Sequence, residues 1–160
     1  MHTYLITGSI VGAGALLLGT LLFTGSSAPP APQALAGAEI EFFRSPTCGC
    51  CGGHADALEE AGADVSVTFV DDVELQEIKR EHGIPFTKQS CHTALMDGYV
   101  LEGHIPIDAL AQLRTRKPDT TGITLPGMPI GTPGMPGPQR EPYIVETLDG
   151  EEFWRKDLPS

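Results

Sequence analysis

The chain has 160 residues, a formal net charge of −11 and four cysteines. All 21 acidic and all 10 basic side chains follow residue 38, so the acidic surface belongs to that part and argues against nucleic acid or anionic lipid as a partner. Its length of roughly 120 residues suits one domain with a modest core.

The N-terminal segment is predicted to be a membrane anchor or a signal peptide. Residues 4–23 carry no charge, and at about 1.5 Å per residue a helix of this length spans roughly 30 Å, the thickness of a hydrocarbon core. The sequence ALA at residues 34–36 also has the small-x-small form of a cleavage site. We therefore expect residues 1–24 to be a signal anchor or signal peptide and residues 25–37 an Ala/Pro-rich tether. Residues 38–160 are then a domain in the periplasm or elsewhere outside the cytoplasm, membrane-anchored or secreted.

The remainder of the chain predicts alternating strands and helices. In chain order these are a strand over residues 39–43, a helix over 54–61, a strand over 65–70, a helix from Asp71 or Asp72 to about His82, a third strand after 86–90, a fourth over 98–102 and a helix over 106–117. On the second helix, Val73, Leu75 and Ile78 are expected on the buried side. Residues 125–138 form a Gly/Pro/Met loop, and residues 143–154 predict a terminal hairpin.

This order is typical of an α/β thioredoxin-like fold, here with a C-terminal Gly/Pro/Met loop and hairpin. The first strand, helix and second strand are expected to form a βαβ unit on a parallel sheet. In thioredoxin-like folds a cis-proline precedes the third strand and packs against the redox cysteines. Ile84-Pro85 occupies that place in the sequence, which favours a cis bond although cis is the minority state even for proline.

Three cysteines within four residues, Cys48, Cys50 and Cys51, follow the first predicted strand. At a helix N-terminus, backbone N–H groups and a partial positive charge favour the nucleophilic, metal-binding thiolate. Sulfur ligands this dense select Cu(I), zinc or an iron–sulfur cluster over hard cations. A small disulfide scaffold is the alternative, but adjacent cysteines are poorly placed to pair with each other.

The fourth cysteine, Cys91, directly precedes His92, and His104 follows 13 residues after it. The strand after Cys91 could run beside the cysteine turn and bring a fourth thiolate to it, with His104 facing the same end from the neighbouring strand. Four sulfurs in a small space could bridge more than one copper ion. His92 and His104 are thus candidate ligands, with a structural histidine as the alternative for each. His54, near the start of a helix, is expected to be exposed, with metal ligation as the alternative.

These motifs resemble those of the CopG-like family of periplasmic copper-resistance proteins, long catalogued as a domain of unknown function. The likeness rests on SPTCGCCGGHADAL (residues 45–58), GIPFTKQSCHTALMDGYVLEGHIP (83–106) and LPGMPIGTPGM (125–135). It implies a thioredoxin fold that is adapted to bind copper. The resemblance gives four metal-binding thiols, Cys48, Cys50, Cys51 and Cys91, with His92 and His104 near them. The family often has an aromatic residue where this chain has His54, so the resemblance assigns that residue no role.

Three functions are consistent with these residues. The first is an exported copper-binding protein that holds Cu(I), supports copper resistance, exchanges copper with other periplasmic copper proteins and cycles its oxidation state. The second is a thiol–disulfide oxidoreductase using Cys48 and Cys51, which leaves Cys50 and Cys91 unexplained. The third is a zinc or iron–sulfur protein with a structural or electron-transfer role. The enzyme class stays open between a copper oxidoreductase and a thiol oxidoreductase. The thioethers of Met128 and Met135 in the Gly/Pro/Met loop are further soft candidate ligands for copper.

Overall fold

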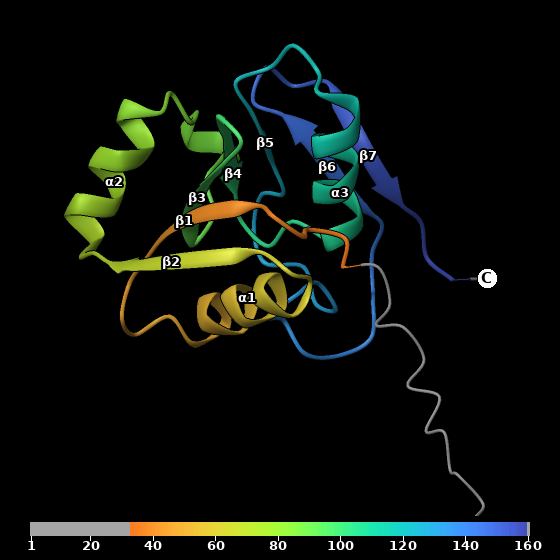
Figure 1. The fold of residues 1–160 in the computed structure, drawn as a ribbon, viewed down its shortest axis with the longest axis horizontal. Coiled ribbons are helices and arrows are strands. Elements are labelled where there is room, and N and C mark those ends of the chain that lie inside the picture. The colour runs from red at the N-terminus through yellow and green to blue at the C-terminus, as the bar shows by residue number, and fades with distance from the viewer. Residues whose placement is uncertain (1–32, 160) are drawn as a thin grey trace, which may run out of the picture.

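The computed structural model describes residues 33–159, which form a seven-stranded sheet and three α-helices (Figure 1). The strands are β1 (Glu39–Arg44), β2 (Asp64–Phe69), β3 (His92–Met96), β4 (Tyr99–Glu102), β5 (Gly122–Thr124), β6 (Tyr143–Thr147) and β7 (Glu152–Lys156). The helices are α1 (Gly49–Glu60), α2 (Asp72–Glu81) and α3 (Ile107–Arg116), with a 3-10 helix over Phe86–Lys88. The predicted anchor and most of the predicted tether lie outside the described residues. At the end of that tether, Leu35 is fully buried.

The sheet is mixed, with the strand order β2-β1-β3-β4-β5-β6-β7. β1 pairs with β2 in parallel, as the predicted βαβ unit requires, and β4 pairs with β5 in parallel. The other neighbouring strands are antiparallel, including the predicted hairpin of β6 and β7. β5 was not predicted, because its three residues are too few to show a pattern. The fold is therefore the predicted alternating α/β chain with its terminal hairpin, extended by one further strand, β5.

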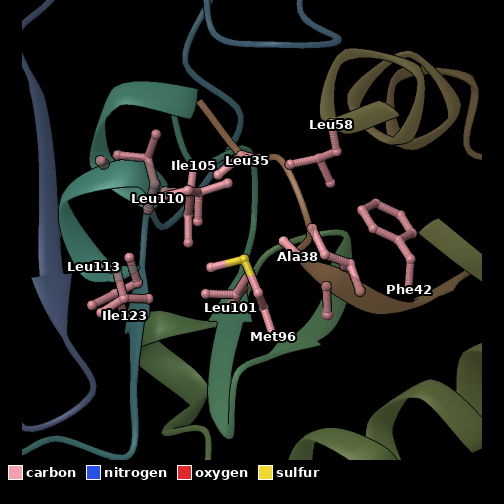
Figure 2. Close-up of a cluster of buried hydrophobic side chains, with 14 of the residues drawn as sticks. Leu35, Ala38, Phe42, Leu58, Met96, Leu101, Ile105, Leu110, Leu113 and Ile123 are labelled. Atoms are coloured by element: carbon pink, nitrogen blue, oxygen red, sulfur yellow. The ribbon is translucent and has the colours of Figure 1, made fainter. Parts of the chain in front are cut away.

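The main core lies between one face of the sheet and helices α1 and α3 (Figure 2). Alternate residues of the strands point into it, such as Phe42 of β1 and Met96 of β3, because successive side chains of a strand face opposite sides. Leu58 of α1 and Leu110 of α3 pack against them from the helices. The centre described below lies at the end of this core where β1 enters α1.

The opposite face of the sheet carries α2. Asp71 caps this helix as predicted, because its carboxylate accepts hydrogen bonds of 2.9 Å from the backbone N–H groups of Val73 and Glu74. The buried side is formed by Leu75 and Lys79, one helical turn apart, whereas Val73 is 80% exposed. The predicted burial of Val73 is therefore wrong.

The predicted cis bond at Ile84-Pro85 is also wrong, because every peptide bond in the described part of the chain is trans. Pro85 has φ −60° and ψ 140° and leads into the 3-10 helix, where its carbonyl accepts a 2.8 Å hydrogen bond from the Lys88 N–H. The residues directly before β3 are Ser90 and Cys91, so Pro85 does not take the place expected of it.

Within residues 33–159, no helix combines the length and apolar character needed to cross a membrane.

Candidate metal centre

The first three cysteines lie between β1 and the first turn of α1. Cys48 is the N-cap residue of the helix, and Cys50 and Cys51 belong to its first turn. The Arg44 guanidinium donates a 2.6 Å hydrogen bond from Nη1 to the Cys48 carbonyl, which ties this turn to the end of β1. The unpaired N–H groups of a helix N-terminus favour a thiolate at this position. The helix thus begins at the cysteines, before its predicted start at His54.

A disulfide joins Cys48 and Cys51, whose Cα atoms are 5.4 Å apart, while Cys50 and Cys91 are free thiols. The Cys50 Sγ lies 3.5 Å from the Cys48 Sγ, and the Cys91 Sγ lies 3.4 Å from the Cys51 Sγ. All four sulfurs lie within 4.8 Å of one another. The structure therefore brings together the four thiols named from the sequence, with two of them oxidised.

The position of Cys91 follows from strand register. β3 runs antiparallel to β1, and the pairing sets His92 opposite Arg44. The start of β3 therefore lies beside the end of β1, where the cysteine turn begins, as expected from the sequence. The backbone N–H of Ser90 also donates to the Glu102 carboxylate, which fixes the residue next to Cys91.

Three histidines, His54, His92 and His104, lie together beside these sulfurs and are 3%, 1% and 0% exposed. His92 begins β3, and its ring stacks on Phe42 at a centroid distance of 4.5 Å. His104 follows Gly103, whose φ of +83° turns the chain after β4, and a Cβ there would come within 2.8 Å of the Ser90 Cβ. The predicted exposure of His54 is wrong, because the residue lies one turn after Cys51 on the buried face of α1.

The hydrogen bond of His104 orients a lone pair toward sulfur. Its Nδ1 lies 2.8 Å from the carbonyl oxygen of Pro133, and a carbonyl can only accept, so Nδ1 carries the proton. In the neutral ring Nε2 is then unprotonated, and it lies 3.1 Å from the Cys91 Sγ. This nitrogen can accept the thiol proton or bind a metal ion held by the same sulfur.

A second hydrogen-bond chain orients His92 in the same way. His54 Nε2 lies 3.2 Å from the Ile105 carbonyl and must donate to it, so its Nδ1 is an acceptor. His92 Nε2, 2.8 Å away, donates to that Nδ1, which leaves His92 Nδ1 unprotonated and 3.4 Å from the Cys91 Sγ. Both nitrogens that face Cys91 are thus potential metal ligands, and His54 positions one of them.

Burial keeps this group of histidines neutral. It lowers the pKa of His54 to about 3, with a smaller contribution from the charge of His104, and lowers the pKa of His92 well below its ordinary value. Burial also lowers the pKa of His104. At Cys91, burial and then the neighbouring Cys50 raise the thiol pKa to about 11. Without a metal, the centre at neutral pH therefore holds neutral imidazoles around a protonated Cys91.

The ligand atoms fall into two overlapping groups, each within 4.8 Å. One group contains the four cysteines, Cys48, Cys50, Cys51 and Cys91; the other contains Cys51, Cys91, His92 and His104. Thiolate and imidazole are soft to intermediate ligands, so the set fits copper or zinc and does not fit calcium or magnesium. All six residues named from the sequence thus lie in one place, and Cys51 and Cys91 belong to both groups.

The Gly/Pro/Met loop covers the centre. Besides the contact of Pro133 with His104, the Ser90 hydroxyl donates a 2.6 Å hydrogen bond to the Gly127 carbonyl. Gly134 has φ +81° and lies against the first turns of α1, so that a Cβ there would come within 2.6 Å of the His54 backbone nitrogen. Only glycine allows this approach. The loop is therefore a wall of the centre.

Two residues beside the centre were not among the six ligands named from the sequence. His54 was left aside, although its spacing of three residues from Cys51 is a signal that both share one helix face. Met128 was named only as a soft candidate, and its Sδ lies 4.0 Å from the Cys50 Sγ. Within residues 33–159, no contact is found between a cysteine and Met135, the other candidate.

Known proteins show similarity to this chain at both the sequence and the structural level. A family model described as "Protein of unknown function, DUF411" matches residues 88–135. Two solved structures of copper resistance protein copG, Form 1 and Form 2, are each 34% identical to this chain. Form 1 has a TM-score of 0.66 and covers 74% of this chain and 97% of that chain; Form 2 has a TM-score of 0.65 and covers 76% and 98%. No curated protein matches the chain. The similarity extends over almost the whole of both solved chains.

Proposed function

This chain belongs to the CopG-like copper-resistance family, and from that premise we propose that it binds Cu(I) at the cysteine cluster and supports copper resistance. Copper is its cargo. The observation that carries the proposal is the pair of overlapping sulfur-rich groups, in which two imidazole nitrogens face the shared Cys91. Thiolates can bridge ions, so a group of four supports binding of more than one Cu(I).

The disulfide links copper binding to the redox state of the chain. While Cys48 and Cys51 are bonded to each other, only Cys50 and Cys91 can supply thiolates. A dithiol reductant opens the bond by transferring two electrons and two protons, which yields two further thiols. Formation of the disulfide could in turn reduce copper. Two Cu(II) ions take one electron each and become Cu(I), while the two thiols form the disulfide and release two protons. The proposal therefore includes a reduced, copper-binding form and an oxidised form of lower capacity.

A competition titration tests copper binding. We expect the reduced full-length chain to take Cu(I) from a chelator of known affinity, and the variant with all four cysteines changed to serine to lose this binding, since serine offers no soft ligand. Elemental analysis of the anaerobically purified chain identifies the native metal. Equal retention of copper by the serine variant would refute the proposal, and zinc or iron in place of copper would favour a structural or electron-transfer centre.

A thiol–disulfide oxidoreductase is the second candidate, favoured by the disulfide itself. Cys48 and Cys51 form it at a helix N-terminus, with the two-residue spacing of thiol–disulfide oxidoreductases. After losing its proton, the nearby Cys91 thiol could attack the Cys51 sulfur, 3.4 Å away, which would form a Cys51–Cys91 disulfide, break the Cys48–Cys51 bond and release Cys48 as a thiolate that takes up a proton. Efficient reduction of insulin disulfides by the metal-free chain would favour this candidate over a copper protein.

The same proposal places the domain outside the cytoplasm. Its support is the apolar segment of residues 4–23, which lies outside the described residues, together with a cysteine-rich domain that suits an oxidising compartment. We expect a reporter that is active only after export to be active when fused after Ser160, and a reporter that is active only in the cytoplasm to be silent there. The opposite pattern would refute export. The N-terminal residue of the mature protein then distinguishes an anchor from a cleaved signal.

A thioredoxin-like unit is also part of the proposal. The parallel pair of β1 and β2 and the antiparallel pairing of β3 with β1 support it, as does a cysteine turn directly after β1. The trans bond before Pro85 departs from that likeness, and Cys91 stands beside the cysteine turn instead. We infer a thioredoxin-like frame in which a metal-binding thiol replaces the usual proline contact.

A further inference from the structure

One edge of the sheet ends in a strand whose outer side has no partner. β2 is the outermost strand, and in the described part of the chain no other segment makes a backbone hydrogen bond to its outer side. The N–H groups of Asp64 and Val70 donate toward β1, at 2.8 and 3.0 Å. Because the backbone groups of successive strand residues point in opposite directions, the even-numbered residues face β1. The N–H and C=O groups of Val65, Val67 and Phe69 therefore face away from the sheet.

The side chains of β2 do not protect this edge. Natural sheets cover or charge their edge strands, because unpaired backbone groups bind further strands. At the opposite edge β7 carries three charged side chains, and the Gln139 amide donates a 3.0 Å hydrogen bond to the Lys156 carbonyl. Over residues 65–69, by contrast, β2 has no charged residue, proline or glycine, and Val67 and Phe69 are 36% and 58% exposed. β2 is therefore an open edge.

The strand is complementary to a second copy of itself. When two β2 strands run antiparallel about a two-fold axis at Val67, each Val67 lies opposite the partner's Val67, and Val65 lies opposite the partner's Phe69. These residues carry the outward backbone groups, so every outward N–H of either copy meets a carbonyl. On the other face of the strand, Ser66 lies opposite the partner's Thr68. Apolar residues thus meet apolar residues and hydroxyls meet hydroxyls, which are cross-strand pairs that stabilise a sheet.

The charges at the two ends of the strand also suit this arrangement. β2 begins at Asp64, and at its other end the Arg44 guanidinium lies 4.9 Å from the centre of the Phe69 ring. An antiparallel pair brings Arg44 and the partner's Asp64 to the same end, so opposite charges lie there. Asp71, the first carboxylate after β2, is held by its hydrogen bonds to the start of α2. We propose that two copies of this chain associate through β2 and form one continuous sheet.

The N-terminal part of the same chain is a poorer occupant of this edge. The Leu35 N–H donates to the Ala61 carbonyl at 2.9 Å, so the chain enters the domain near the start of β2. The residues before it include Pro29, Pro30 and Pro32, and proline has no N–H to donate to a neighbouring strand. A second copy brings an uninterrupted strand instead. This inference does not depend on copper binding.

Co-purification of two full-length copies with different affinity tags tests the pair. We expect the second copy to be recovered with the first in wild type. Val67→Lys sets two like charges opposite each other at the axis, so it should lower this recovery about tenfold or more. Val73→Lys is the matched control, because it changes an 80% exposed valine on α2, away from the edge. Both variants should keep the circular dichroism spectrum of wild type, which shows that they are folded.

Amide hydrogen exchange of the wild-type chain locates the interface. We expect the N–H groups of Val65, Val67 and Phe69 to be protected in concentrated solution and to exchange faster on dilution, whereas those of Ser66 and Thr68 stay protected. Rapid exchange of the three outward groups at every concentration would refute the β2 pair, as would full recovery of Val67→Lys. Protection that does not change on dilution would assign the edge to residues 1–32 of the same chain and would also overturn the proposal.

Discussion

Changing Cys91 to serine is expected to remove most of the bound copper from the reduced chain. Cys91 supplies a sulfur to both overlapping ligand groups, and the unprotonated nitrogens of His92 and His104 both face it. Serine keeps the size of the side chain and offers no soft ligand. Loss of residues that merely support a metal ligand costs about 10–100-fold in affinity, so the loss of this shared ligand should weaken copper binding by about 100-fold or more. Chelator competition and elemental analysis measure both quantities.

Cys50→Ser is the matched control, because Cys50 belongs to only one of the two groups. We expect it to keep more copper than Cys91→Ser, at the site formed by Cys51, Cys91 and the two histidines. Copper should raise the thermal unfolding midpoint of wild type, since binding to the folded state alone adds stability, and Cys91→Ser should lose this increase. Full copper occupancy in Cys91→Ser would contradict the shared-ligand arrangement.

Lys79→Met is expected to destabilise the fold by about 3–5 kcal/mol, the usual result of leaving one partner of a buried ion pair without the other. The side chains of Lys79 and Glu102 are both 0% exposed and pair on the sheet face under α2. The Thr93 hydroxyl joins them, donating to Glu102 at 2.7 Å and accepting from Lys79 at 3.0 Å. Glu102 also accepts from the Ser90 N–H, so the variant should loosen the segment that presents Cys91. Urea unfolding of the chain with its disulfide intact measures the loss.

Two further variants distinguish the buried pair from a surface one. Arg155→Met removes an ion pair with Glu152 whose side chains are 39% and 49% exposed, and it should leave the urea midpoint almost unchanged. The double variant Lys79→Met/Glu102→Leu should recover part of the stability lost in the single variant, because no unpaired charge stays buried. A single variant Lys79→Met as stable as Arg155→Met would show that the buried pair contributes little.

Local patterns predicted those parts of the centre that depend on neighbouring residues. The cysteine turn after β1 is contiguous in sequence, and the order of elements in a thioredoxin-like fold was enough to suggest that the strand after Cys91 would run beside it. β5 was not predicted because three residues are too few to show a periodic pattern. The cis bond before Pro85 was wrong because it was inferred from the fold likeness alone. His54 was misjudged because its burial depends on Ile105 and His92, which are far away in sequence.

Long-range pairing explains the other parts that could not be predicted. A lysine on a helix normally faces solvent, and nothing near Lys79 in the sequence indicates that Glu102 lies opposite it across α2 and β4. The contact of Met128 with Cys50 spans 78 residues, within a loop that has no periodic pattern. Such contacts depend on how the elements pack, so residue spacing cannot reveal them.

The directions of the histidine hydrogen bonds determine what must leave the centre when a metal ion binds. His92 and His104 face Cys91 with unprotonated nitrogens, and their N–H groups are held on the far side of the rings by His54 and Pro133. An arriving ion therefore displaces protons from sulfur alone. Metal binding therefore releases protons only from thiols that were protonated beforehand, so a pH electrode in unbuffered solution could count how many of these thiols become ligands.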